Sequence, residues 1–263
     1  MKLRYLLALL LLLLPACTES DAMTTMMLGG GVASAGLDAG CQAGATFTYN
    51  TNHTSGTNYA CDSAGAPLEG TLEVATIHDG YLDAPTVNDY IVWTVDSSEI
   101  SSAAGTLYIS VYFDDTGDAA PNSDLDSNEV FEFYYDANNY IDCRSQDTGE
   151  NLTCRYMANG TEAEAAIGDF DLVIDTWYRI GYTWSIAVTD HELDHAVSAV
   201  ACDGADCTGL SEVWEEDTNE LIEDFTTEAT TIVIGEKDLG YMYDDMWATD
   251  VMVLDGYMTP DPL

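Results

Sequence analysis

The clearest structural signal in the chain is the stretch Asp175-Thr-Trp-Tyr-Arg-Ile-Gly-Tyr-Thr-Trp184. It is dense in aromatic and β-branched residues, which fit the pleated, half-buried surface of a β-sheet. Pro is absent from it, and nothing in it has the spacing of an amphipathic helix. The stretch therefore predicts a β-strand over Trp177–Ile186.

Runs of the same character recur on both sides of this stretch, from about residue 45 onward. We expect these further strands: Thr71–His78, Tyr90–Val95, Thr106–Phe113, Val130–Tyr135, Phe170–Ile174, Thr230–Ile234 and Thr249–Leu254. Clusters of Gly, Asn, Asp and Ser lie between the runs and favour turns, and long amphipathic helices are scarce. The pattern predicts an all-β chain, an antiparallel β-sandwich or jelly roll that forms one domain over residues 45–258.

Composition and charge narrow the possible functions. The chain has 263 residues, of which 47% are apolar, so it can bury a sizeable core and is not a disordered acidic tail. It has 47 Asp and Glu residues against 6 Lys and Arg residues, and its formal net charge is −41. So few cations exclude nucleic-acid binding through phosphate contacts and adsorption to anionic lipid through a basic patch.

The N-terminus has the features of an export signal. Lys2 and Arg4 precede an unbroken apolar run, Tyr5–Leu14, which is too short to span a bilayer as a helix. The run ends in Leu14-Pro-Ala-Cys17, which resembles the lipobox of bacterial lipoproteins. The resemblance implies that residues 1–16 are removed, that Cys17 is lipidated, and that the protein is exported and anchored to a bacterial membrane. The mature charge would then be −43, because residues 1–16 hold two bases and no acid.

Residues 17–44 are rich in Thr, Met, Gly and Ala, and we interpret them as a flexible tether. Six cysteines follow Cys17, an even number that indicates disulfides in an exported chain. Six cysteines allow fifteen pairings. Their spacing suggests that neighbours pair, namely Cys41 with Cys61, Cys143 with Cys154, and Cys202 with Cys207.

The stretch Asp175–Trp184 also resembles a strand of laminin-G-like and concanavalin A-like jelly rolls, which carry a Trp-Tyr pair at its start. The segment Thr231-Ile-Val-Ile-Gly235, followed by Tyr243-Asp-Asp-Met-Trp-Ala-Thr-Asp-Val-Met-Val-Leu254, is similar to the closing strands of that family. The resemblance covers about residues 70–257. It implies a fold whose members mostly bind carbohydrates or proteins, with glycanases as a subset.

The motif His191-Glu-Leu-Asp-His195 offers an enzymatic alternative. On a helix the two His side chains would share one face and could bind zinc, with Glu192 as general base and Glu215 as third ligand. The segment resembles the zinc helix of thermolysin-like peptidases. The competing interpretation is a hairpin in which residues 189–194 form the turn and 195–202 the return strand, and we favour the hairpin.

Glycanases of the concanavalin-like fold offer a second enzymatic alternative, since they use paired carboxylates on one strand. Here Glu192-Leu-Asp194 would supply the first half of such a motif, but Ala196 and Val197 stand where the second Glu belongs. The sequence therefore argues against glycanase activity.

An acidic loop suggests a calcium site. Carboxylate and amide oxygens are dense between residues 114 and 129, which suits an ion that takes six to eight oxygen ligands. The spacing is not that of an EF-hand, and a solvated acidic loop remains the alternative. The candidate calcium ligands are Asp114, Asp115, Asp118, Asp124, Asp126 and Asn128.

Sugar binding needs an aromatic face for stacking and polar groups for the hydroxyls. Trp214 lies next to acidic residues in the sequence, as do Tyr241, Tyr243 and Trp247. Three other tryptophans, Trp93, Trp177 and Trp184, fall in strand patterns, and we expect them in the core. We interpret the chain as a binding protein for a glycan or a surface partner, with calcium as a candidate cofactor. The alternatives are a zinc peptidase and a structural surface protein.

Overall fold

The computed structural model of the chain describes residues 41–84, 89–96, 98–114, 129–146, 151–167, 175–186, 192–205, 214–222, 230–235 and 245–256. All of them belong to one compact unit, Gly31–Leu263. Their regular secondary structure consists of β-strands, and every pair of neighbouring strands is antiparallel. The predicted all-β sandwich is therefore confirmed.

The first sheet, sheet A, contains the longest strands of the domain. Its order is β15-β14-β13-β8-β17-β1-β2-β3, and β6 adds to β17 and carries β5. Their bounds are β15 Trp214–Leu221, β14 Glu192–Cys202, β13 Thr176–Ile186, β8 Ala104–Asp114, β17 Asp245–Asp255, β1 Ala45–Tyr49, β2 Tyr59–Cys61, β3 Pro67–Glu69, β5 Thr76–His78 and β6 Tyr81–Ala84.

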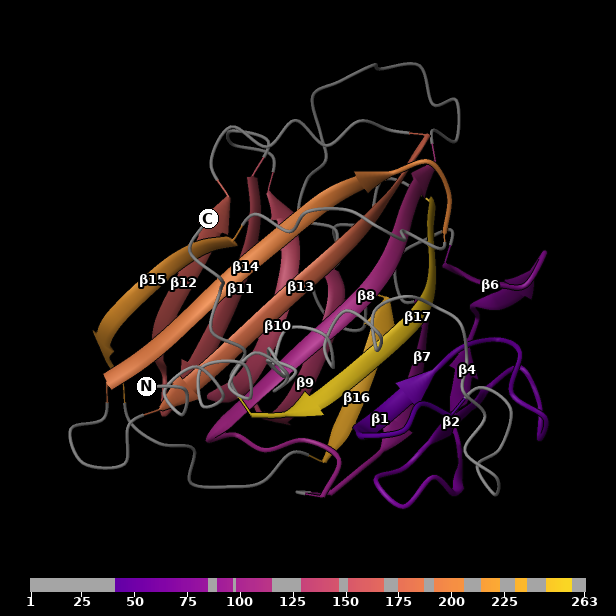
Figure 1. Ribbon diagram of the computed structural model, residues 1–263, viewed down its shortest axis with the longest axis horizontal. Helices are drawn as coiled ribbons and strands as arrows, with labels where there is room; N and C mark the ends of the chain where they lie inside the picture. The colour runs from indigo at the N-terminus through magenta and orange to yellow at the C-terminus, as the bar shows by residue number, and fades with distance from the viewer. Residues whose placement is uncertain are drawn as a thin grey trace, which may run out of the picture. The chain divides into compact units, whose positions relative to one another are not determined.

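The second sheet, sheet B, has the order β12-β11-β10-β9-β16-β7-β4. Its strands are β12 Thr161–Ile167, β11 Asn151–Ala158, β10 Asn139–Gln146, β9 Glu129–Asp136, β16 Thr231–Gly235, β7 Tyr90–Thr94 and β4 Thr71–Glu73. Figure 1 shows β14, β13, β8 and β17 side by side in one layer, with β9–β12 in the layer behind.

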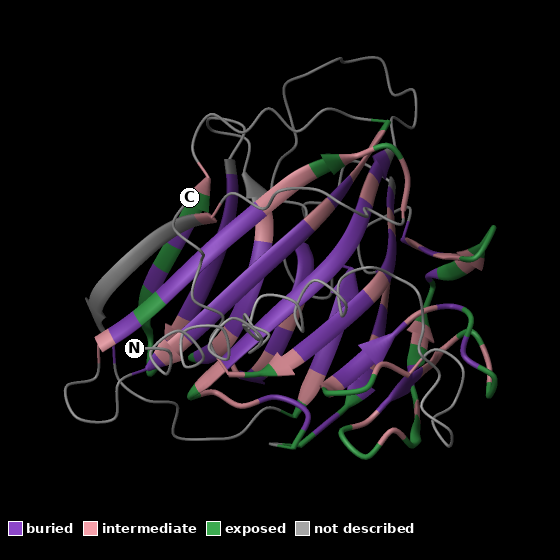
Figure 2. Cartoon of the chain, in the orientation of Figure 1, coloured by how far each residue is buried: buried purple, intermediate pink, exposed green. Residues whose placement is uncertain are grey.

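The core lies between the two sheets, where alternate residues of each strand meet. Phe47 of sheet A packs edge-on against Trp93 of sheet B, with ring centroids 5.3 Å apart. Trp184 of sheet A and Phe133 of sheet B make a second such contact at 5.8 Å. Figure 2 shows the long strands as mostly buried and the chain around β5 and β6 as mostly half-buried or exposed. The expectation that Trp93 and Trp184 are core residues is confirmed.

One predicted strand is wrong as a single element. The run Thr71–His78 forms two strands, β4 in sheet B and β5 in sheet A. The break falls at Val74, whose backbone has a φ of 59° and whose side chain is exposed. Such a left-handed residue cannot continue a strand, so the chain passes from one sheet to the other there. The predicted strand Phe170–Ile174 lies outside the described residues.

Two of the three predicted disulfides are present. Cys41 is bonded to Cys61 and Cys143 to Cys154, with Cα atoms 5.5 Å and 4.0 Å apart. Cys143 and Cys154 are directly paired on β10 and β11 and lie fully buried in the core. Cys202 is also disulfide-bonded, while its predicted partner Cys207 lies outside the described residues.

Candidate binding surface

Four half-buried aromatic rings lie on the outer face of sheet A, at one end of its long strands. Trp177 on β13 is paired with Tyr112 on β8, and Tyr112 is paired with Trp247 on β17. Directly paired residues project from the same face of a sheet, so these three rings form a row across three strands. Tyr81 on β6 joins the row from the neighbouring strand. We call Tyr81, Tyr112, Trp177 and Trp247 the outer aromatic cluster.

Each ring of the outer aromatic cluster contacts two of the others. The centroid of Trp177 lies 4.9 Å from that of Tyr81 and 5.4 Å from that of Tyr112. The centroid of Trp247 lies 6.1 Å from Tyr81, with nearly parallel rings, and 5.0 Å from Tyr112. These separations are typical of favourable aromatic pairs. The rings therefore hold one another in place, so they would lose less conformational entropy when a ligand binds to them.

Strand alternation explains why these rings face outward. Phe113 and Tyr178 point into the core, so their strand neighbours Tyr112 and Trp177 point away from it. The expectation that Trp177 is a core residue is therefore wrong. The segment carries aromatic residues on both of its faces, and composition does not distinguish the two faces. The adjacent pair Trp177-Tyr178 was the available signal, because neighbours in a strand face opposite ways.

A tight hairpin brings Tyr81 to the cluster. Asp79 and Gly80 have φ values of 49° and 89°, as in the two-residue type I′ turn that suits the twist of β-strands. The turn pairs His78 with Tyr81. The His78 ring lies 6.3 Å from Trp247, between ring centroids. The hairpin thus adds an imidazole to the edge of the outer aromatic cluster.

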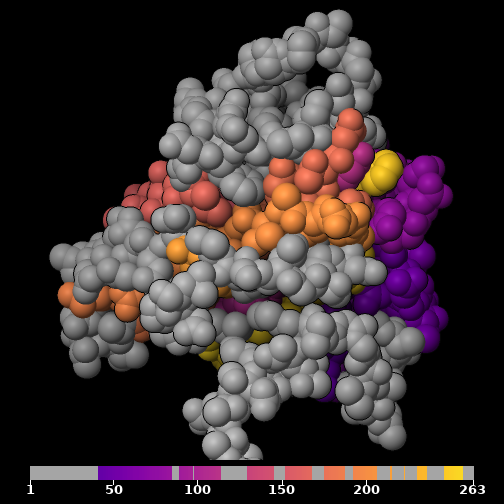
Figure 3. All heavy atoms as spheres, turned by 45° about the horizontal axis from the view of Figure 1, so that its top comes forward, coloured from indigo at the N-terminus to yellow at the C-terminus, as the bar shows by residue number. Residues whose placement is uncertain are grey.

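Carboxylates surround the cluster. The Tyr112 hydroxyl donates a hydrogen bond of 3.2 Å to Oδ1 of Asp175, an exposed residue. Asp83 is paired with Trp247 and therefore projects from the same face. At the hairpin tip, the Asp79 side chain is 79% exposed and lies 3.6 Å from Nδ1 of His78. The space-filling view shows yellow atoms of β17 at the surface beside purple atoms from the start of the domain (Figure 3).

The structure separates the residues that the sequence suggested for sugar binding. Trp247 belongs to the outer aromatic cluster. Trp214 lies on β15, where its ring contacts Tyr108 edge-on at 6.3 Å. It shares the outer face of sheet A, because it is paired with Ser198, and Ser198 with Gly181, which stands opposite Tyr108. Tyr241 and Tyr243 lie outside the described residues.

One of the six candidate calcium ligands, Asp114, lies within the described residues. Asp115, Asp118, Asp124, Asp126 and Asn128 lie outside the described residues. Asp114 is the last residue of β8, where its backbone is paired with Asp245 on β17. Asp114 therefore lies at the same end of β8 as Tyr112 of the outer aromatic cluster. Calcium binding by this loop remains a prediction.

The HExxH motif does not form a zinc-binding helix. Residues Glu192–Cys202 are β14, which pairs along its length with β13. Residues four apart in a strand are separated by about 13 Å, so a strand does not offer the single face on which a helical turn brings two imidazoles together. His191 itself lies outside the described residues. The helical alternative is wrong, and the favoured return strand over 195–202 is confirmed. The predicted turn over 189–194 is wrong in part, because residues 192–194 already belong to β14.

The other members of that motif have structural surroundings. His195 is fully buried, and its Nδ1 lies 2.9 Å from the hydroxyl oxygen of Tyr182. Glu215, the proposed third zinc ligand, is paired with Val197 through the backbone of β15. Glu192 stands at the start of β14. Without the helix, nothing assigns a general-base role to Glu192.

The outer face of sheet B holds a buried ion pair. Arg155 donates two hydrogen bonds to the carboxylate of Asp142, with the Nε–Oδ1 bond at 2.8 Å, and a third of 3.2 Å to Glu162. Burial raises the pKa of the Asp142 carboxyl, and the charge of Arg155 opposes that rise. Burial alone would lower the pKa of Arg155, but hydrogen bonding and charge from Asp142 raise it above its usual range. The pair ties β10, β11 and β12 together.

The described cations have partners within the protein. Arg144 lies 3.8 Å from the Glu164 carboxylate. Arg179 donates hydrogen bonds to Ser110 Oγ at 3.0 Å and to the Asp250 carbonyl at 2.7 Å, and it lies over the Tyr108 ring. Because these cations interact with other groups of the protein, the described surface is poorly suited to bind an anionic ligand.

Within the described residues, no helix is long and apolar enough to cross a membrane.

Comparison with known proteins identifies the fold alone. No protein-family model matches the sequence, and no curated protein matches it. The structure is similar to the botulinum neurotoxin serotype D binding domain, with a TM-score of 0.57 and 10% identity over 83% of this chain and 49% of that chain. It is also similar to the botulinum neurotoxin type G receptor-binding domain, with a TM-score of 0.56 and 8% identity over the same shares. This chain thus spans about half the length of those structures.

Proposed function

We propose that this chain is a surface-anchored binding domain and that the outer aromatic cluster holds a carbohydrate ligand. The observation that carries the proposal is a set of four half-exposed, mutually packed rings bordered by carboxylates on a rigid sheet. Flat aromatic faces accept the apolar face of a sugar ring, and carboxylates accept hydrogen bonds from its hydroxyl groups. The similar solved structures are themselves binding domains, which supports this class of function.

The charge distribution restricts the sugar. Asp79, Asp83 and Asp175 border the cluster, and the whole chain has a formal charge of −41. An anionic sugar would meet repulsion there, because like charges close together oppose binding. A neutral sugar or an amino sugar fits these surroundings. The lipid anchor at Cys17 would keep the domain at the bacterial surface or in the periplasm, where such ligands occur.

Calcium is part of the proposal as an aid to binding. The acidic loop after Asp114 starts at the end of β8 that bears the cluster, so an ion there would act close to the ligand. Calcium would accept oxygen ligands from the carboxylates of this segment and weaken the repulsion among them.

A glycan array probed with and without calcium tests the function. We expect binding to neutral or amino sugars, and stronger binding with calcium. Trp177→Ala and Trp247→Ala should each weaken the best interaction at least tenfold, as expected for loss of a stacking ring. Trp214→Ala, on the same face but outside the cluster, is the matched control. Binding confined to acidic glycans, or absence of glycan binding with recovery of a protein partner, would overturn the carbohydrate proposal.

A further inference from the structure

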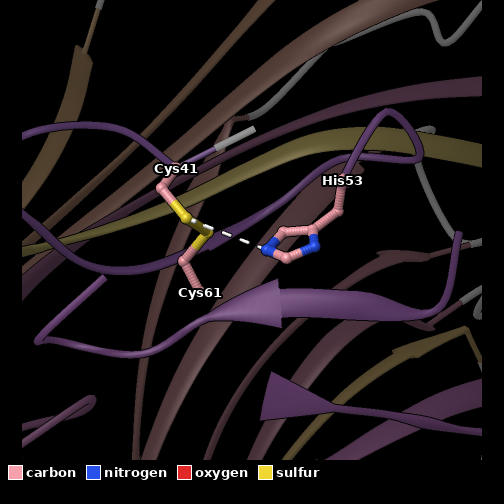
Figure 4. A group of neighbouring side chains, drawn as sticks. All are labelled: Cys41, His53 and Cys61. Carbon is pink, nitrogen blue, oxygen red and sulfur yellow. Dashed lines mark hydrogen bonds between the residues drawn. A yellow bond between two sulfur atoms is a disulfide. The ribbon is translucent and has the colours of Figure 1, made fainter. Parts of the chain in front are cut away.

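A histidine lies against one of the two fully described disulfides. Cys41, Cys61 and His53 place their two sulfur atoms and one imidazole nitrogen within 4.8 Å of one another. Nε2 of His53 lies 3.8 Å from Sγ of Cys41. Figure 4 shows the edge of the imidazole ring directed at the sulfur atoms of the disulfide.

The hydrogen bond at Nδ1 of His53 determines which ring nitrogen carries the proton in the neutral imidazole. The backbone N–H of Ser55 donates a hydrogen bond of 3.1 Å to Nδ1 of His53. Nδ1 is therefore the acceptor nitrogen, and in the neutral ring the proton is on Nε2. That proton faces Cys41. The ring is held in place by burial and by stacking on Tyr59 at 6.0 Å.

This tautomer argues against a metal site and for a thiolate site. A metal ion would need the lone pair of Nε2, which the proton occupies. An N–H group aimed at sulfur instead stabilises a thiolate, because a hydrogen bond to a charged acceptor is about twice as strong as a neutral one. A thiolate stabilised in this way has a lowered pKa and exchanges readily with other disulfides.

The two cysteines differ in access. Cys41 is half-exposed, while Cys61 is 2% exposed. A surface hollow lined by residues 41–45, 48 and 61–65 opens onto the disulfide. An external thiol can therefore reach Cys41. By contrast, Cys143 and Cys154 are fully buried in the core.

We propose that Cys41, Cys61 and His53 form a site of thiol–disulfide exchange that acts on external dithiols and disulfides. Cys41 is the exchanging cysteine, Cys61 the resolving cysteine, and His53 the hydrogen-bond donor to the Cys41 thiolate. A thiolate of an external dithiol attacks Cys41 Sγ, the Cys41–Cys61 bond breaks, and Cys61 leaves with the electron pair. The second thiolate then attacks the external sulfur of the mixed disulfide and releases Cys41 as a thiolate. The dithiol loses two electrons, and the protein disulfide gains them.

The location gives this exchange a structural consequence. The disulfide closes a loop of 20 residues that contains β1, and Cys41 is where the expected tether meets the domain. Reduction would release residues 41–44 from β2 and lengthen the tether. The protein would then report the thiol status of its surroundings through the freedom of its N-terminal segment.

The test uses the full chain carrying Cys17→Ser, equilibrated in mixtures of reduced and oxidised dithiothreitol, with alkylation and mass spectrometry to follow each cysteine. We expect Cys41–Cys61 to be reduced while Cys143–Cys154 stays oxidised. His53→Phe keeps a ring for stacking on Tyr59 but has no N–H group, so it should make Cys41–Cys61 about fivefold harder to reduce, since the thiolate loses its donor. His78→Phe, at an exposed histidine away from the disulfides, should leave the reduction of Cys41–Cys61 unchanged.

A second measurement separates the role of His53 from a general loosening of the loop. In the chain with Cys17→Ser and Cys61→Ser, Cys41 is a free thiol, and His53→Phe should slow its alkylation by iodoacetamide at pH 7 about fivefold. A loosened loop would speed alkylation instead. Equal alkylation rates with and without His53, or simultaneous reduction of both disulfides, would overturn the proposal.

Discussion

Trp177 and Trp184 lie on the same strand, β13, and their surroundings differ completely. Trp184 is fully buried, its Nε1 donates a hydrogen bond of 3.1 Å to the Ser101 carbonyl, and its ring contacts Phe133 across the sandwich. Trp177 is half-exposed and packs against rings of the outer face. They stand seven positions apart, an odd number, so alternation places them on opposite faces. One strand thus supplies the core with one tryptophan and the candidate binding surface with the other.

The comparison shows where aromatic residues contribute to stability and where they are available for recognition. On the inner face, Tyr182 and Trp184 pack together, and the Tyr182 hydroxyl interacts with His195. On the outer face, the hydroxyl of Tyr112 interacts with an exposed carboxylate instead. The inner groups have little freedom to meet a ligand, while the outer groups keep part of their surface in solvent.

The largest expected effect is on the inner face. Trp184→Ala removes a fully buried ring between the two sheets and leaves a cavity in the core, which should lower the free energy of unfolding by about 3–5 kcal/mol. Chemical denaturation monitored by circular dichroism measures this change. A loss similar to that of Trp177→Ala would mean that the two faces contribute equally to stability.

Alanine substitutions at two glycines, one on the inner and one on the outer face of sheet A, should also differ in how much they lower the stability. A Cβ atom at Gly105 would lie 2.3 Å from the buried Trp184 ring, and one at Gly181 would lie 2.8 Å from the half-buried Trp214 ring. Gly105→Ala should cost about 2 kcal/mol, since the core has no room to adjust. Gly181→Ala should cost less than half as much, because Trp214 can move. Thermal unfolding of the two variants side by side measures the difference, and the reverse order would contradict the assignment of inner and outer faces.

Trp177→Ala should have a small effect on stability. It removes two ring contacts at the surface, worth about 1 kcal/mol together. The same variant should lose ligand binding, which Trp184→Ala tests poorly because it weakens the fold. A variant that keeps full affinity while losing several kcal/mol of stability would assign Trp177 to the core after all.

The smallest effect concerns the outer face of sheet B. Burial, a hydrogen bond with Glu162 and the charge of Glu162 raise the pKa of Glu164. A raised pKa in the folded state means that protonation stabilises the fold. This contribution is fully present below the unfolded-state pKa, and it is lost as the pH rises through the folded-state value. Glu164→Gln should therefore add about 0.3 kcal/mol at pH 7, a value discounted for solvent exposure.

Denaturation at pH 7 and at pH 4 checks this sign. The gain from Glu164→Gln should shrink at the lower pH, where the native Glu164 is itself protonated. Glu73→Gln, a carboxylate on the edge strand β4 and away from Glu162, is the control. A larger gain for Glu164→Gln at low pH would show that the pKa of Glu164 is lowered instead.

The sequence was sufficient for the fold class and for part of the strand pattern. The run Trp177–Ile186 is β13, and Val130–Tyr135 lies within β9, because aromatic and β-branched residues dominate both. It was insufficient at Val74, where a backbone torsion rather than composition ends the strand. Strands β10, β11, β12 and β15 were not predicted. In β15, for example, half of the residues are acidic, and they leave no apolar face to recognise.

The candidate site was less predictable than the fold. Trp247 was found because acidic residues surround it in the sequence. Tyr81, Tyr112 and Trp177 reach it only through strand pairing across the sheet, and register is not visible in one sequence. The pairing of Cys41 with Cys61 was predictable from spacing, but its contact with His53 depends on the fold of the loop between them.

Affinity for the best array ligand, measured by titration calorimetry, tests the central claim most directly. The comparison is between the native chain, Trp177→Ala, Trp247→Ala and Trp214→Ala, each first shown by circular dichroism to be folded. We predict at least a tenfold loss of affinity for the two variants in the outer aromatic cluster, and an unchanged affinity for Trp214→Ala. Full affinity in Trp177→Ala and Trp247→Ala, with the fold intact, would contradict the assignment of this surface as the binding site.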